Sequence, residues 1–102
     1  MQRRTMPHLT SQSEIEAALV DVRSAIGQAE ALHGPLTDDH FRAFAILGEE
    51  VGEVAKALLE NRRALAKGRS GTAERVNARL ELAQVAATAV LMLINLKREG
   101  AE

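Results

Sequence analysis

The last third of the chain restricts the fold most, because it reads as a helix that is apolar on most of its circumference. From Leu82 to Leu96 nearly every residue is apolar. A helix that is apolar all round has to be covered all round. Two other helices from a chain of 102 residues can hardly supply that cover. We therefore expect a helical bundle that is completed by oligomerisation, as a homodimer or a homotetramer.

The polar residues of this segment are not scattered. They follow one another at steps of 3, 4, 3, 4 and 7, and they are Glu74, Asn77, Glu81, Gln84, Thr88 and Asn95. At about 100° per residue, these steps keep them on one strip roughly 80° wide. A buried polar group without a partner costs about 1–3 kcal/mol, so we expect something polar to face the strip.

Three helices are predicted, at about 13–33, at 38–61 or 38–67, and at 72–98. Glycine and proline separate them, and the chain contains no alternating β-branched run and no hairpin signal. The fold class is therefore all-α. We treat 1–102 as a single domain in which residues 1–12 are a loose lead-in.

The ends of these helices carry recognisable signals. Ser13 and Glu16 have capping-box spacing, and Gly34 followed by proline ends the first helix. Thr37 is the expected N-cap of the second helix. Phe41 and Phe44 lie on the apolar stripe of the second helix, so we expect them in the core.

Composition excludes several classes of function. The chain has 2% aromatic residues and a formal net charge of −1, which argues against a nucleic-acid binder. It contains no cysteine, as is usual in a reducing compartment. The arginines near the N-terminus are followed by no apolar segment, and the run Leu82–Leu96 is shorter than the roughly 20 residues that span a bilayer. We expect a cytoplasmic protein that neither spans nor binds a membrane.

The second predicted helix concentrates three carboxylates, Glu49, Glu50 and Glu53, on neighbouring turns. Gly48 and Gly52 beside them predict the close approach of another helix or a ligand. Facing carboxylates repel unless a cation lies between them, and an all-oxygen set of ligands suits magnesium or manganese. The alternative interpretation is a solvated helix face.

The sequences LGEEVGEVAKAL (47–58) and ELAQVAATAV (81–90) resemble the MazG-like all-α nucleoside triphosphate pyrophosphohydrolases. That family carries Glu-Glu-x-x-Glu, a spacer, and then Glu-x-x-Asp. Glu49, Glu50 and Glu53 match the first half, and Glu81 matches the first acid of the second half. The resemblance covers about half of the chain. One position departs from the pattern, because Gln84 stands where the family has Asp.

The resemblance implies magnesium-dependent hydrolysis of a (deoxy)nucleoside triphosphate to the monophosphate and pyrophosphate, as in the removal of unwanted nucleotides. It implies Glu49, Glu50, Glu53 and Glu81 as metal ligands, with Glu49 or Glu50 as the catalytic base. Gln84, Lys56 and Asn95 are candidate substrate-binding residues. Because a carboxamide brings no negative charge, Gln84 also supports an alternative: a non-catalytic helical dimer of the same fold that acts as a binding or regulatory module.

Overall fold

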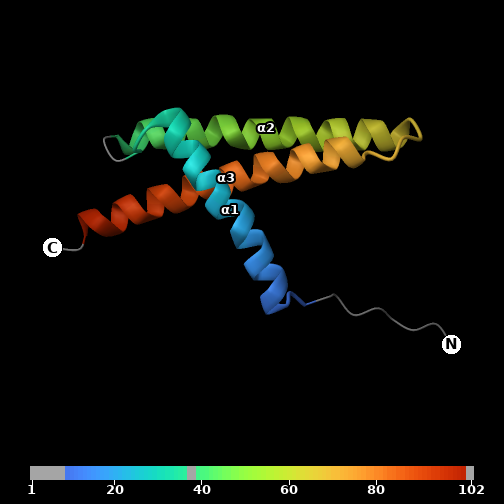
Figure 1. Ribbon diagram of the computed structural model, residues 1–102. Coiled ribbons are helices and arrows are strands. Elements are labelled where there is room, and N and C mark those ends of the chain that lie inside the picture. The colour runs from blue at the N-terminus through green and yellow to red at the C-terminus, as the bar shows by residue number, and fades with distance from the viewer. Residues whose placement is uncertain (1–8, 37–38, 101–102) are drawn as a thin grey trace.

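The structure is a computed structural model that describes residues 9–36 and 39–100. Within these ranges the chain forms three helices (Figure 1). The helices are α1 (Gln12–His33), α2 (His40–Ala66) and α3 (Thr72–Glu99). No strand occurs in these two ranges, so the all-α prediction is confirmed. Figure 1 shows that α2 and α3 form a long antiparallel hairpin, while α1 crosses α3 and its N-terminal half projects away from the hairpin. The central helix of the arrangement is α3, which packs against both α2 and α1.

The N-terminal cap of α1 lies two residues earlier than predicted. Ser11, not Ser13, forms the capping box: its hydroxyl accepts from the backbone N–H of Glu14 at 3.2 Å, and its own N–H donates to the Glu14 carboxylate at 2.9 Å. Both serines have a glutamate three residues later, so both have the spacing of a capping box. The earlier pair forms it, and the helix therefore begins at Gln12.

The N-cap of α2 is Asp39, whose carboxylate accepts from the N–H groups of Phe41 and Arg42. An aspartate at this position satisfies two orphan donors and interacts favourably with the helix dipole. Thr37, the predicted cap, lies outside the described residues. The prediction for the end of α1 is confirmed: Gly34 has φ 72° and donates its N–H to the carbonyl of Glu30.

The turn between α2 and α3 depends on glycine. Gly68 and Gly71 have φ values of 79° and 69°, which disfavour a side chain. Gly71 is also sterically confined, since a Cβ there would lie 2.8 Å from Asn61 Nδ2 and 3.1 Å from Leu65 Cδ2. Asn61 donates to the Gly71 carbonyl at 2.9 Å and so ties the end of α2 to the start of α3.

The buried residues of the chain are mostly alanines, and its large apolar residues are mostly exposed. Within residues 9–36 and 39–100, seven of the nine buried apolar side chains are alanine; the other two are Leu36 and Leu91. The predicted core residues Phe41 and Phe44 are instead 85% and 64% exposed. Monomeric globular proteins usually bury their aromatic and branched side chains first. One copy of this chain therefore leaves much of its apolar surface uncovered.

By length and composition, α3 could cross a membrane. This differs from the expectation based on the run Leu82–Leu96, because the helix extends beyond that run at both ends. Core helices of soluble proteins meet the same criterion.

Candidate functional site

The face of α2 that packs against α3 contains a single carboxylate. Its buried alanines are Ala43, Ala57 and Ala64, and Glu50 completes the series at a spacing of seven residues. Alanines let the two helix backbones come close together, and the spacing of seven keeps all four residues on one line along the helix. We call this line the α2 seam. Glu50 is thus placed between the helices, where it is only half-exposed.

Part of the polar strip of α3 faces the α2 seam. Its own series at a spacing of seven consists of Glu74, Glu81, Thr88 and Asn95. Thr88 and Asn95 are 0% and 5% exposed, and the two glutamates are half-exposed. Among the described residues, the expectation that something polar faces the strip is met only at Gln84, which bonds to Gln28, and at Asn95, which bonds to the Leu36 carbonyl. Most of the α2 seam opposite the strip is alanine.

Contacts at both ends of the hairpin define its antiparallel register. At one end Nε2 of His40 lies 2.9 Å from both carboxylate oxygens of Glu99, and at the other Asn61 reaches Gly71. Counting inward from these ends brings Glu50 to within about one helical turn of Thr88. The same count from the two ends places Glu81 level with the stretch of α2 between Val51 and Leu58.

Glu49 and Glu53 lie to one side of the α2 seam, by about 100° and 60° respectively at 100° per residue. Both side chains are exposed, and so is that of Lys56. Because α2 and α3 are antiparallel, this flank lies on the same side of the hairpin as Gln84. The pattern Glu-Glu-x-x-Glu therefore has one acid in the seam and two beside it.

Among residues 9–36 and 39–100, no group of three or more His, Asp or Glu side chains is gathered closely enough to hold a metal ion. The chemistry of the donors nevertheless suits a cation at Glu50. Its Oε1 atom is buried and has no hydrogen-bond partner. A carboxylate oxygen in that state is unfavourable unless a positive group or a donor reaches it. A cation or a hydrogen-bond donor that reached Oε1 of Glu50 would therefore be favourable.

The predicted close approach at Gly48 and Gly52 does not occur within the chain. A Cβ added at either glycine would meet no atom within 4 Å. Both glycines point away from the α2 seam, so neither α1 nor α3 lies against them.

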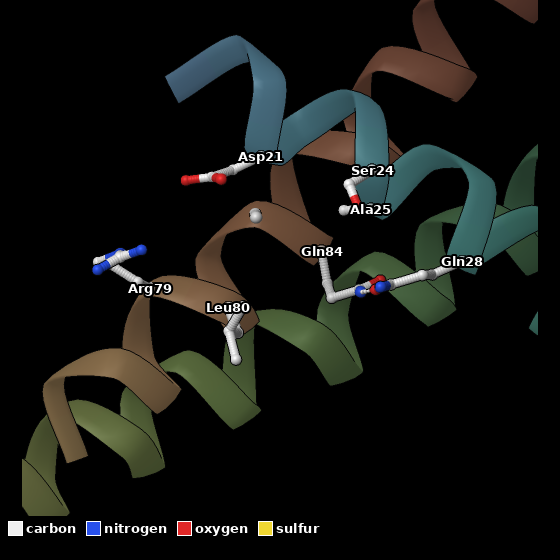
Figure 2. A pocket seen from close by; sticks show the side chains of 8 residues that line it. Asp21, Ser24, Ala25, Gln28, Arg79, Leu80 and Gln84 are labelled. Atoms are coloured by element: carbon white, nitrogen blue, oxygen red, sulfur yellow. Dashed lines mark hydrogen bonds between the residues drawn. The ribbon is translucent and has the colours of Figure 1, made fainter. Parts of the chain in front are cut away.

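Gln84 faces α1, and its Nε2 donates to Oε1 of Gln28 at 2.7 Å. The two amides form one wall of a pocket of about 70 Å³ between α1 and α3. Figure 2 shows Asp21 and Arg79 at the other side of this pocket. Gln84 therefore joins α3 to α1.

Asn95 has a structural partner of its own. Its Nδ2 donates to the carbonyl of Leu36 at 2.7 Å, and both residues are buried. This bond ties the end of α3 to the connection between α1 and α2, beside the cluster of Ala29, Ala43 and Leu91. Of the three candidate substrate-binding residues, Asn95 is the one held inside the fold.

No family model, no curated protein and no solved structure matches this chain. The MazG-like resemblance therefore rests on the residues of the two motifs alone.

Sequence reasoning assigned no role to Thr88 and did not single out Gln28. The sequence did contain a signal for Thr88, because this residue lies on the same polar strip as Glu81, seven residues further along. Gln28 gave no local signal, since its partner lies 56 residues away in the sequence.

Proposed function

We propose that this protein is a magnesium-dependent nucleoside triphosphate pyrophosphohydrolase, which converts a (d)NTP into the (d)NMP and pyrophosphate and so removes unwanted nucleotides. The observation that carries the proposal is the unpartnered buried carboxylate oxygen of Glu50. It belongs to a Glu-Glu-x-x-Glu pattern on α2, and the other motif acid, Glu81, faces the same seam from α3. The MazG-like resemblance supplies the reaction.

Four carboxylates would hold the cation, those of Glu49, Glu50, Glu53 and Glu81. Magnesium, or manganese in its place, would neutralise the polyphosphate and polarise the attacked phosphorus. A water oxygen attacks the α-phosphorus, the bond from this phosphorus to the α–β bridging oxygen breaks, and pyrophosphate leaves. The carboxylate of Glu49 or Glu50 accepts the proton of the water. Lys56 is exposed on the flank of Glu53, where its ammonium group can contact a phosphate.

Replacing Glu50 by Gln tests the proposal. The amide keeps the size of the side chain but removes the charge, so magnesium-dependent pyrophosphate release should fall at least about 100-fold while helicity is unchanged. Glu60→Gln is the matched control, an exposed glutamate on the same helix, and it should retain full activity. A panel of nucleoside triphosphates should be assayed with each variant. Equal turnover in wild type and Glu50→Gln would refute the site.

The proposal includes self-association. An exposed apolar face runs along the hairpin and consists of Phe44, Val51, Leu58 and Leu65 on α2 and Leu82, Leu93 and Leu96 on α3. We call it the outer face. Because the helices are antiparallel, both sets fall on one side of the hairpin, away from the flank of Glu49 and Glu53.

The size of the outer face suits a second copy of the chain. Each helix is about 40 Å long, and two helices packed 8–10 Å apart are roughly 20 Å wide. The footprint is therefore about 800 Å² per copy, which is the usual size for a stable interface. Two hairpins that meet through this face form a four-helix bundle, as a homodimer or as half of a homotetramer.

One observation favours the alternative, a non-catalytic helical dimer that binds a ligand or regulates a partner. Gln84 is already bonded to Gln28, so its amide is not free to serve a substrate without breaking that bond. Turnover by the wild-type chain decides between the two functions. For either one we place the protein in the cytoplasm, where a chain without cysteine needs no oxidising environment.

A further inference from the structure

Two unsatisfied polar atoms lie in the same seam. The buried side-chain atoms without a hydrogen-bond partner, within the part of the chain that the structure describes, are Oε1 of Glu50, Oγ1 of Thr88 and Nδ1 of His40. The first two come from facing helices, at facing positions of the two seven-residue series. Most buried polar groups in folded proteins have a partner, so two orphans at one level of a helix pair call for an explanation.

The hydroxyl of Thr88 is the more unusual of the two. A threonine inside a helix normally satisfies its hydroxyl through the carbonyl four residues earlier, which here belongs to Gln84. Thr88 makes no such bond, although it is completely buried. Its hydroxyl is therefore a donor without an acceptor, within about one helical turn of a carboxylate oxygen that has no donor.

We propose that Thr88 is a positioning residue for Glu50: its hydroxyl donates to Oε1 of Glu50 when a divalent cation binds, and this bond orients the carboxylate toward the cation. The inference rests on the proposed function, because it needs a cation at Glu50. Oε1 then accepts the hydrogen bond while the carboxylate retains lone pairs for the metal. Bonds of this kind to metal-binding carboxylates typically change metal affinity by 10–100-fold.

A Thr88→Val variant gives two readouts that should move in opposite directions. Valine has nearly the shape of threonine but no hydroxyl, so the metal-free protein loses an unsatisfied buried group and its Tm should rise by about 4 °C or more. The dissociation constant for Mn²⁺, measured by calorimetry, should increase about tenfold or more, and the rise in Tm on adding Mn²⁺ should shrink. A threonine with a merely structural role would not strengthen the apoprotein while weakening metal binding.

Three further variants complete the experiment. Thr88→Ser keeps the hydroxyl and should retain Mn²⁺ affinity within about threefold. Thr88→Ala also removes the hydroxyl, and it takes the place of Thr88→Val if that variant does not fold. Thr72→Val, an exposed threonine on the same helix, should change neither readout.

The outcomes separate the two proposals. If wild type binds Mn²⁺ and Thr88→Val binds it equally well, the role of Thr88 is refuted and the proposed function stands. An unchanged or lower metal-free Tm in Thr88→Val also refutes it. If wild type binds neither Mn²⁺ nor Mg²⁺, both proposals are refuted.

Discussion

Replacing Asn95 by alanine should destabilise the protein through one buried hydrogen bond. Asn95 is 5% exposed and its partner, the Leu36 carbonyl, belongs to a residue that is 2% exposed, so water cannot replace the lost donor. A buried acceptor left without its partner costs about 1–3 kcal/mol. The loss of side-chain volume adds to this, and we expect the free energy of unfolding to fall by about 2–3 kcal/mol.

The expected shift in melting temperature follows from the size of the chain. For a domain of about 100 residues, 1 kcal/mol corresponds to roughly 4–8 °C. Asn95→Ala should therefore melt about 8–24 °C below wild type when unfolding is followed by circular dichroism. Urea denaturation should show a lower midpoint at an unchanged slope.

Asn77→Ala is the matched control, because Asn77 lies on the same polar strip of the same helix but is exposed. Its unfolding free energy should stay within about 0.5 kcal/mol of wild type. Equal melting temperatures for Asn95→Ala and Asn77→Ala would show that the bond to Leu36 contributes nothing to stability. That result would return Asn95 to the candidates for substrate binding.

Two further predictions concern the turn and the outer face. Gly71→Ala should lower the free energy of unfolding, measured by chemical denaturation, more than Gly68→Ala does. Both glycines have positive φ, but only at Gly71 does the added Cβ meet neighbouring atoms. Equal losses in the two variants would contradict this prediction. Leu58→Glu should convert the oligomer to monomers in sedimentation experiments and weaken association by at least about 100-fold, because two copies of the leucine leave the interface. Leu32→Glu is the control, because Leu32 is also an exposed leucine but lies on α1, outside the outer face; this variant should leave the oligomer intact. An unchanged assembly in Leu58→Glu would refute the proposed interface.

The sequence was sufficient for the helices and for the end of α1 at Gly34, but it was insufficient for the N-cap of α1. Helix existence follows from apolar periodicity and from punctuation by Gly34 and Gly71, which are local properties. The cap of α1 was misplaced because two serines offer the same spacing to glutamate, and local pattern alone does not choose between them.

Burial was harder to predict than helicity. Phe41 and Phe44 belong to a regular apolar stripe, yet within one chain that stripe faces no other helix. A helical period shows that a face is apolar but does not show which neighbour covers it. The alanines of the α2 seam gave the weaker hydrophobic signal and became the buried face, because they allow α3 to approach.

By itself the sequence determined three helices, one strip of polar residues on the last of them, and the carboxylate pattern of Glu49, Glu50 and Glu53. These features depend on the spacing of residues along a single helix, which backbone geometry fixes at 3.6 residues per turn. The tertiary structure alone decided that an oxygen of Glu50 is buried between α2 and α3 and that Gln84 turns to Gln28. Those pairings join residues far apart in the chain, and they depend on how closely whole helices pack against one another.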